Sequence, residues 1–475
     1  MVEKLRPDLC VIGAGAAGLS VAAAAAAFGV SVVLVEKGKM GGECLNTGCV
    51  PSKALLAAAK RAVYARSSVQ FGIGPSSINV DFARVRDHVR CVIANIAPND
   101  SAERFTALGV RVIKGSARFA DRWTVIVDDE FEIRARRFVI ATGSSPAVPP
   151  IPGLDQTGYF TNETIFDLAT PPEHLLVIGA GPVGLELAQA FRRLGSAVTV
   201  VDAALPLAND DPECAAVVVE NLAREGVTIR SGVTVVKASG AVGNVELTVS
   251  DAGQAEVLRG THLLVAAGRA PRLDGLALDV GRVKHGPSGI RVNKRLKTSN
   301  RRVFAIGDVI GQLQFTHAAN YQAGLVIRSA VFRQRVHLDN DAIPWVTYTD
   351  PELAQTGLTE AQACQRGIKI RVLRWPYHDN DRAQAERATL GHIKVVTDRR
   401  GTILGATIVG AQAGELITAW TLAISQKLNI RAFAGIVIPY PTLSEISKRA
   451  AIDFFTPSLT SSWARRIIAW LRLLG

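Results

Sequence analysis

The chain has 475 residues, a mass of 50.5 kDa and a formal net charge of +12, with 48% hydrophobic and 20% charged residues. This length allows two or three globular domains, and six cysteines are too few for a secreted disulfide framework. The basic residues are spread along the chain without a basic motif interleaved with aromatic residues, so we expect no nucleic-acid partner.

The N-terminal region has the pattern of a βαβ dinucleotide-binding unit. A predicted buried strand at residues 8–12 leads into Gly13, Gly15 and Gly18, an alanine-rich helix follows, and the next predicted strand ends at Glu36. Gly13 makes the turn, Gly15 lets the backbone approach a pyrophosphate, and Gly18 permits close packing of the helix. Glu36 can accept the ribose hydroxyls. The strand, the helix and the acid together make the pattern specific.

Two cysteines five residues apart, Cys44 and Cys49, follow in the glycine-rich run 41–53. This run resembles the active-site motif of the class I pyridine nucleotide-disulfide oxidoreductases, and the resemblance implies a redox-active disulfide served by a flavin. A zinc site would need a second pair of cysteine or histidine ligands, but the other four cysteines stand alone. Two inert core thiols would not need the surrounding glycines, nor Pro51 at the start of an apolar helical run. No metal site is therefore expected.

The same dinucleotide-binding pattern occurs a second time. A predicted strand at residues 175–178 leads into Gly179, Gly181 and Gly184, and the next predicted strand ends at Asp202. The acid follows the first glycine by 23 residues in both copies. This matched spacing indicates two nucleotide sites.

The family resemblance assigns FAD to the first copy and NAD(H) to the second. Three later segments match family motifs in the same order, namely Ala141-Thr142-Gly143, Gly268-Arg269-Ala270-Pro271 and Ala305-Ile306-Gly307-Asp308. They add Thr142, Gly143, Gly268 and Asp308 to the predicted cofactor-binding residues. Since Asp202 repels a 2′-phosphate and no arginine follows it closely, we expect NADH to be preferred over NADPH.

The resemblance also implies an α/β fold with two Rossmann-like nucleotide-binding domains and a C-terminal α+β dimerisation domain. The FAD domain is expected to be split between residues 1–150 and 278–343, with the NAD(P) domain at 151–277. The dimerisation domain is expected at 344–455, and a basic amphipathic helix at 456–475. In the family this third domain forms the homodimer and sends a catalytic segment into the partner's active site.

Several residues take roles from the family motifs. A hydride passes from the nicotinamide to the flavin, and the electrons then reach the disulfide. The resemblance makes Cys49 the thiolate near the flavin, where a helix dipole stabilises it, and Cys44 the interchange thiol that faces the substrate. Lys53 and Glu186 match a family pair beside flavin N5, where a cation stabilises the reduced flavin. Without this context each would be interpreted as an ordinary surface residue.

The chain departs from the family at Tyr440, where disulfide-reducing members usually carry a histidine oriented by a glutamate, here Glu445. Histidine, with a pKa of about 6.5, exchanges protons near neutrality, whereas tyrosine, at about 10, stays protonated. We therefore expect slow turnover of dihydrolipoamide and electron transfer to quinones or other small acceptors. Tyr440 is interpreted as a proton donor or a clamp on a ligand oriented by Glu445, and the alternative is a packing role at the dimer interface.

The sequence thus predicts an FAD-dependent oxidoreductase that passes electrons from NADH through the disulfide to a thiol, disulfide or other small acceptor. A metal reductase is one alternative, because mercuric reductases carry a tyrosine at the position of Tyr440. Against it, the chain has no adjacent C-terminal cysteines and no N-terminal metal-binding domain. A redox-sensing flavoprotein associated with a membrane is the other alternative, and the intact Cys44 and Cys49 speak against a loss of redox function.

Residues 461–474 mix tryptophan, isoleucine, leucine and arginine with helical spacing. They predict a helix that packs on the dimer, and they leave open a weak contact with an anionic membrane surface. The apolar run at residues 9–35 is broken by three glycines in dinucleotide-turn spacing, and Glu36 closes it. It is therefore neither a signal peptide nor a membrane span, and we expect a cytoplasmic protein.

Overall fold

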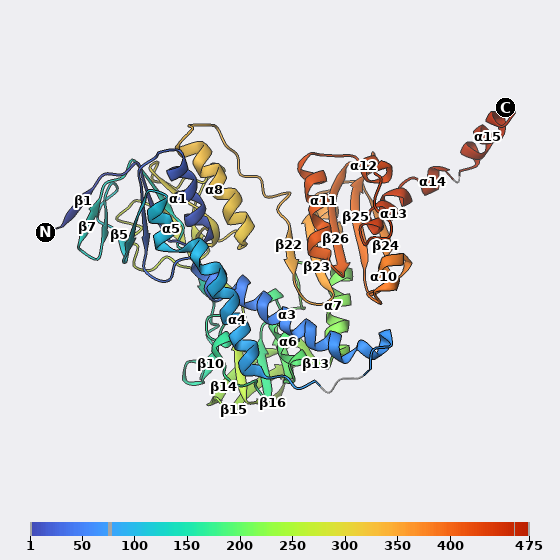
Figure 1. Cartoon of the computed structure of the whole chain (residues 1–475), viewed down its shortest axis with the longest axis horizontal. Coiled ribbons are helices and arrows are strands. Elements are labelled where there is room, and N and C mark those ends of the chain that lie inside the picture. The colour runs from blue at the N-terminus through green and yellow to red at the C-terminus, as the bar shows by residue number, and fades with distance from the viewer. Residues whose placement is uncertain (1, 75–77, 460, 474–475) are drawn as a thin grey trace. The chain divides into compact units, whose positions relative to one another are not determined.

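The structure, a computed structural model, describes residues 2–74, 78–459 and 461–473 (Figure 1). The chain divides into two compact units. The first comprises Met1–Gly179, Arg193–Val198 and Thr234–Asp339, and the second comprises Ala180–Arg192, Thr199–Val233 and Asn340–Gly475. Each unit combines sheets with helices, so the predicted α/β fold class is confirmed.

A five-stranded parallel sheet forms the centre of the first unit. Its strands have the order β21-β8-β2-β3-β4 and span Val303–Ala305, Arg137–Ile140, Leu9–Ile12, Val32–Glu36 and Val110–Lys114. Strands buried on both faces are continuous apolar runs, as in β2 and in β3 up to Val35. The strands predicted at residues 8–12 and 32–36 are confirmed. The predicted site residue Gly13 directly follows β2, and the predicted site residue Glu36 is the last residue of β3.

Helices α1 (Ala16–Ala27) and α8 (Thr316–Ala330) pack side by side next to this sheet (Figure 1). Alanine fills most of α1 and has the highest intrinsic helix propensity. Its small side chain also permits close approach: a Cβ on Gly307 would lie 3.4 Å from the Cβ of Ala17 and 3.6 Å from the Cβ of Ala319. Small residues on both helices thus allow the segment that carries Asp308 to lie between them.

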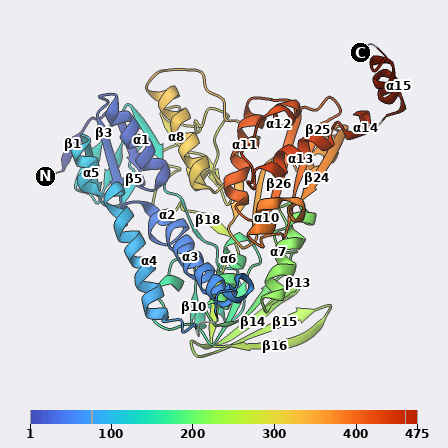
Figure 2. The ribbon, with the colours of Figure 1, turned by 45° about the vertical axis from the view of Figure 1, so that its right-hand side comes forward.

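Smaller elements complete the first unit. The helices after β3 are α2 (Gly42–Asn46), α3 (Cys49–Arg66), α4 (Phe82–Ile96) and α5 (Ala102–Ala107). A small sheet has the order β1-β7-β6-β5, spanning Glu3–Leu5, Phe131–Ile133, Val125–Val127 and Ala117–Phe119. Parallel strands pair in the order β10-β17-β11, spanning Tyr159–Phe160, His262–Val265 and His174–Ile178. Figure 2 shows the antiparallel ribbon of β14 (Thr234–Ala241), β15 (Asn244–Asp251) and β16 (Gln254–Gly260).

An antiparallel sheet with the order β22-β23-β26-β25-β24 forms the centre of the second unit. Its strands span Trp345–Thr347, Glu352–Gly357, Ile403–Gly410, His392–Asp398 and Ile370–Pro376. Helices α11 (Ala413–Ser425), α12 (Arg431–Gly435) and α13 (Glu445–Asp453) build a core on one face around the fully buried Trp420. The Trp420 indole N–H donates to Ser447 Oγ at 3.0 Å, and Phe433 stacks on the ring at 3.8 Å. Ile393 and Val395 of β25 belong to this core.

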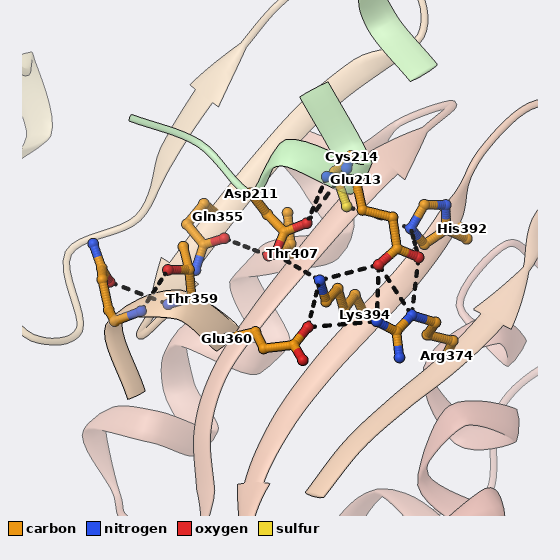
Figure 3. Close-up of polar contacts among 11 residues, drawn as sticks. Asp211, Glu213, Cys214, Gln355, Thr359, Glu360, Arg374, His392, Lys394 and Thr407 are labelled. Atoms are coloured by element: carbon orange, nitrogen blue, oxygen red, sulfur yellow. Dashed lines mark hydrogen bonds and ion pairs between the residues drawn. The ribbon is translucent and has the colours of Figure 1, made fainter. Parts of the chain in front are cut away.

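A buried lysine connects helix α7 (Pro212–Arg224) to the other face of this sheet (Figure 3). Lys394 lies between two core residues of β25 and points away from that core, because strand residues alternate in direction. Its ammonium, only 4% exposed, lies 2.8 Å from oxygens of Asp211 and Glu360 and 3.0 Å from Glu213. Burial opposes the charge, but the hydrogen bonds to the three carboxylates outweigh burial and raise the pKa of Lys394. Hydrogen bonding to Arg374 is the main cause that lowers the pKa of Glu213 to about 2.

Helices α14 (Thr456–Leu459) and α15 (Ser462–Leu471) lie within residues 456–475, where a basic amphipathic helix was predicted. Residues 460, 474 and 475 of the predicted tail lie outside the described residues. No residue of α15 is buried, and Trp463 and Trp470 are 71% and 61% exposed. Within the described ranges, none of the helices combines the length and the apolar character that crossing a bilayer requires.

Candidate functional site

The first glycine turn joins β2 to α1 and admits only glycine at two positions. Gly13 has φ 104°, and a Cβ there would lie 2.4 Å from the carbonyl oxygen of Ala141. A Cβ on Gly18 would lie 1.8 Å from the carbonyl oxygen of Gly13. Both contacts are with backbone, which cannot move aside. The structure thus gives Gly13 and Gly18 the turn and packing geometry that the sequence pattern predicts.

Glu36 is held against this turn by backbone N–H groups. Its carboxylate accepts hydrogen bonds from Ala14 N at 2.6 Å and from Gly38 N at 2.7 Å. Two N–H donors fix the carboxylate at the carboxyl end of β3, and its remaining lone pairs can accept hydroxyl groups. This is the chemistry that the position of Glu36 in the sequence predicts.

The residues around the turn fit a dinucleotide. No side chain caps the amino end of α1, whose N-cap residue is Gly15. A Cβ on Gly15 would meet only the Cα of Gly42, at 3.8 Å, so the turn leaves room for a close ligand. The first N–H groups of a helix without a capping side chain favour a phosphate group. FAD would thus be held by Gly15 and the first turn of α1 at its pyrophosphate and by Glu36 at its ribose.

The cysteine segment lies in backbone contact with the same turn. Gly42 has φ 61°, and a Cβ there would lie 2.7 Å from the Cα of Gly15. Cys44 lies in α2, and Cys49 is the first residue of the 18-residue helix α3. A thiolate at the amino end of a helix of this length is stabilised by the helix dipole.

Thr316, the first residue of α8, contacts both sulfurs. Its hydroxyl donates to Cys44 Sγ at 3.1 Å and lies 3.7 Å from Cys49 Sγ. The two cysteines are not joined by a disulfide bond in this structure. The hydrogen bond with Cys49 is the largest cause that raises the pKa of Cys44, burial is the second, and the hydrogen bond from Thr316 opposes both. The raised pKa keeps the proton on Cys44, and the thiolate at Cys49 stays a prediction.

Arg269 joins the cysteine segment to two of the later motifs. Its guanidinium forms an ion pair with Glu43, the residue before Cys44. Its Nε also donates to Ser144 Oγ at 2.8 Å, and Ser144 donates to Asp308 Oδ2 at 2.5 Å. This chain of contacts orients the carboxylate of Asp308. Asp308 was among the predicted site residues, whereas Glu43 and Ser144 were not, although each lies directly beside one in the sequence.

The strand-end motifs show the open geometry that a cofactor site requires. Thr142 donates its hydroxyl to the carbonyl oxygen of Arg272 at 2.8 Å. Gly143 and Gly268 have φ values of 71° and 112°, and a Cβ on either would meet no atom within 4 Å. Both positions thus combine a backbone conformation that favours glycine with free space beside it.

The second glycine turn resembles the first, because the acid that ends the following strand is again bound by backbone N–H groups. Gly179 has φ 112°, and a Cβ there would lie 2.4 Å from the carbonyl oxygen of Ala266. Asp202, at the end of β12 (Ala197–Asp202), accepts from Ala180 N at 2.6 Å and from Ala204 N at 2.8 Å. These donors correspond in position to those of Glu36. A Cβ on Gly181 would meet nothing within 4 Å, which fits a nucleotide, and Gly184 lies in α6 (Pro182–Arg193).

The predicted pair of Lys53 and Glu186 stays a prediction. Lys53 lies on α3 of the first unit, where its ammonium donates to Ser52 Oγ at 3.4 Å. Glu186 lies on α6 in the second unit, is buried, and accepts a hydrogen bond from Tyr348 N at 2.8 Å. Glu186 is thus a buried carboxylate that a backbone N–H group holds in place. It is not the ordinary surface residue that would be expected without the family context.

Tyr440 has a different partner from the one that we expected. Its hydroxyl donates to Asp381 Oδ2 at 2.9 Å, and this hydrogen bond is the main cause that raises the pKa of Tyr440. Glu445, at the start of α13, contributes only a weaker electrostatic effect in the same direction. Asp381 begins α10 (Asp381–Ala385), 59 residues before Tyr440. No local pattern in the sequence relates the two residues, so only the fold identifies this partner.

Among the residues that the structure describes, no group of three or more histidine, cysteine or acidic side chains could hold a metal ion. None of the six cysteines, all of which lie in the described ranges, forms a disulfide, and Cys10 and Cys214 are buried.

Comparison with known proteins places these features in one family. Residues 7–323 match the family model of the pyridine nucleotide-disulphide oxidoreductases, and residues 343–451 match the dimerisation domain of the same family. A mercuric reductase from Lysinibacillus sphaericus is 35% identical over 459 residues, covering 96% of this chain and 84% of the relative. A dihydrolipoyl dehydrogenase from Staphylococcus aureus is 34% identical over 460 residues, covering 94% and 96%. The HOCl-induced flavoprotein disulfide reductase RclA from Escherichia coli is similar in structure, with a TM-score of 0.84, 27% identity and coverage of 96% and 100%.

Proposed function

Because the chain belongs to the pyridine nucleotide-disulphide oxidoreductases, we propose that it oxidises NADH and passes the electrons through Cys44 and Cys49 to a small acceptor. The chain is an FAD-dependent oxidoreductase of this family, and its match to the dimerisation domain supports a homodimer. The observation that carries the proposal is the contact of one hydroxyl, that of Thr316, with both sulfurs beside the first glycine turn.

The net chemistry balances at the two sulfurs. Oxidation of NADH to NAD⁺ releases two electrons and one proton, and these break the S–S bond and form one thiol and one thiolate. FAD, when bound, supplies the acceptor of the hydride. Asp202 supports NADH over NADPH as the donor, because its carboxylate is fixed by Ala180 N and Ala204 N, where it would repel a 2′-phosphate.

The two sulfurs have different tasks in this proposal. Cys49, at the amino end of α3, holds the thiolate. Cys44 keeps the proton and, as the interchange thiol, reacts with the acceptor. Thr316 stabilises the arrangement, since its hydroxyl can donate to one sulfur while it stays near the other. Transfer of the two electrons to an acceptor re-forms the disulfide and releases the one proton that Cys44 held.

Tyr440 sets the class of acceptor. The hydrogen bond to Asp381 raises the pKa of the phenol, so the tyrosine is an even poorer base than an isolated one. A general base contributes roughly 10² to 10⁴ in rate. We therefore expect quinones to be reduced briskly and dihydrolipoamide to be turned over slowly. Tyr440→His should raise dihydrolipoamide turnover by on the order of 10²-fold, because Asp381 would orient the imidazole as a base.

Steady-state turnover of dihydrolipoamide, glutathione disulfide, Hg(II) and quinones by the wild type and Tyr440→His checks this expectation. Tyr64→His is a matched control, because Tyr64 is an exposed tyrosine on α3. It should leave every rate within about twofold. Brisk dihydrolipoamide oxidation by the wild type, with no gain in Tyr440→His, would show that another group supplies the base.

Reduction of a metal ion is the second candidate function. Four bacterial relatives that are 34–37% identical carry the name mercuric reductase. Cys44 and Cys49 could bind a thiophilic ion between them, and this supports Hg(II) as a substrate in the turnover comparison.

We also propose that helix α15 touches an anionic membrane surface. Its tryptophans are exposed and none of its residues is buried. Arg465 and Arg466 lie on the same helix, and Arg472 directly follows it. This composition suits an anionic interface. A chain ending at Thr456 should bind anionic vesicles more weakly than the full chain, as co-sedimentation would show, and equally weak binding by both would contradict the contact.

A further inference from the structure

A cluster of cations lies at the edge of the FAD-domain sheet that is opposite to the predicted cofactor site. β8 begins at Arg137, and β21 begins directly after Arg302, whose carbonyl oxygen accepts from Phe138 N at 2.9 Å. Gly13 and Gly143 follow the other, carboxyl ends of the strands. The amino edge of the sheet is therefore separate from the residues that the proposed catalysis uses.

The cations at this edge stand close enough to repel one another. Burial first, and then the neighbouring Arg302, Arg136 and Arg333, lower the pKa of Arg137. Burial, Arg137 and Arg295 likewise lower the pKa of Lys297. We name as the basic edge the six residues Arg122, Arg137, Arg295, Lys297, Arg302 and Arg333.

The basic edge has little compensating charge. Arg136 pairs with Asp8 at 3.1 Å, but in the described part of the chain no member of the basic edge forms an ion pair. Arg122 and Arg302 instead each lie 4.2 Å from the ring centroid of Trp123. An indole ring with two guanidinium groups holds two positive charges in place near each other. Such a cluster is unfavourable for the isolated protein and is suited to a surface with many anions.

An exposed aromatic pair adjoins the basic edge. Phe28 caps the carboxyl end of α1 and Phe332 follows α8, and the two are 58% and 48% exposed. Their ring centroids are 4.9 Å apart with an interplanar angle of 83°. Arg333, the residue after Phe332, belongs to the basic edge. Since α1 and α8 pack against each other, the two rings lie together beside the carboxyl ends of these helices.

We infer that the basic edge and the Phe28–Phe332 pair dock the protein on an anionic lipid surface. Arginine binds lipid phosphates, and exposed phenylalanines enter the boundary between headgroups and acyl chains. Single-stranded nucleic acid would need aromatic faces open for stacking. Here the Trp123 ring is contacted by two guanidinium groups and the two phenylalanine rings pack edge to face. This surface is distinct from α15, and the inference does not depend on the identity of the electron acceptor.

The test is co-sedimentation of the full-length, FAD-loaded protein with vesicles of phosphatidylglycerol and phosphatidylcholine, compared with pure phosphatidylcholine. The wild type should bind only the anionic vesicles. Arg295→Glu with Arg302→Glu should weaken binding by roughly 20-fold or more, because each cation near an anionic surface contributes roughly a fivefold effect. Phe28→Ser with Phe332→Ser should also weaken binding, and NADH oxidation in solution should stay unchanged in both.

Two matched control variants distinguish an effect of this surface on binding from a general effect of net charge or of exposed apolar side chains. Arg399→Glu with Arg400→Glu makes the same change in net charge at exposed residues of the second unit, and Val242→Ser with Val257→Ser removes exposed apolar side chains of the first unit. Both control variants should change vesicle binding by less than about threefold, because salt screens charges that lie more than about 10 Å from the membrane surface. If the two glutamate substitutions disturb folding, Arg295→Gln with Arg302→Gln replaces that variant. It should give an intermediate loss of vesicle binding.

The inference is overturned if the wild type does not bind anionic vesicles, or if the edge variants bind as well as the controls. It is also overturned if Trp463→Ser with Trp470→Ser abolishes binding while the edge variants keep it, since α15 alone would then carry the contact. Edge-dependent binding to single-stranded RNA or to an acidic protein, without vesicle binding, would reassign the surface.

Discussion

Replacement of Cys49 by serine is expected to lower turnover with disulfide and other dithiol-dependent acceptors by on the order of 10³-fold or more. Without Cys49 no disulfide can form with Cys44, so electrons from NADH have no route to the acceptor through the sulfurs. The long-wavelength absorbance of a thiolate beside the flavin should also be lost. Cys44→Ser should instead retain this absorbance, because the thiolate at the amino end of α3 remains.

Titration of thiols under denaturing conditions supplies a readout that is independent of turnover. The oxidised wild type should show two fewer reactive thiols than the reduced wild type, whereas Cys49→Ser should show no difference. Cys91→Ser is the matched control, because Cys91 is an exposed thiol on α4. It should keep activity and absorbance. Retention of disulfide-dependent turnover by Cys49→Ser would refute the assignment of the redox pair.

Replacement of Lys394 by methionine is expected to destabilise the protein by about 3–5 kcal/mol, because one partner of a buried ionic network is removed. Asp211 is only 1% exposed and would lose the ammonium 2.8 Å away. Glu213 and Glu360 would keep Arg374, at 2.8 Å and 3.4 Å. The loss should therefore arise mainly from one unpaired buried carboxylate, and urea unfolding followed by circular dichroism at fixed protein concentration measures it.

The deficit of Lys394→Met should shrink in acid. The pKa of Glu213 falls from 4.5 to about 2 in the folded protein, so its stabilising contribution is fully present above about pH 4.5 and is lost as the pH falls toward 2. The wild type thus loses stability over this window, whereas Lys394→Met has already lost the ion pair between Lys394 and Glu213. The raised pKa of Lys394 affects stability at high pH. The contribution of Lys394 to the free energy of unfolding is fully present below pH 10.5 and is lost as the pH rises through the pKa of the folded protein.

Two further variants test the cause of this loss. Asp211→Asn combined with Lys394→Met removes the unpaired charge and should recover more than half of the lost stability, since the two sites are coupled. Lys369→Met changes an exposed lysine of the same unit and should cost less than about 0.5 kcal/mol. If the double variant were no more stable than Lys394→Met, the network would not be held by charge.

Much of the fold and part of the site could be predicted from the sequence because they depend on local properties. The positive φ of Gly13 and Gly179 and the strand ends at Glu36 and Asp202 follow from spacing that a single βαβ unit imposes. The family resemblance extended this to the two cofactors and the dimerisation domain, which the matches over residues 7–323 and 343–451 confirm.

Other features could not be predicted, because they join segments far apart in the chain. Thr316 reaches Cys44 across 272 residues and Arg269 reaches Glu43 across 226, and neither residue has a local signature that names its partner. Glu445 lies close to Tyr440 in sequence, yet the hydroxyl bonds to Asp381 because α10 presents that carboxylate to it.

By itself, then, the sequence determined where the backbone turns and which strands are buried, since glycine conformation and apolar periodicity act within a few residues. The family resemblance added the expectation that Cys44 and Cys49 are the reactive sulfurs. Only the tertiary structure decided that Thr316 contacts both sulfurs, which carboxylate holds Tyr440, and how Lys394 is neutralised. These outcomes depend on burial and on hydrogen bonds between distant segments, and burial and polar contacts become defined only when the chain is packed.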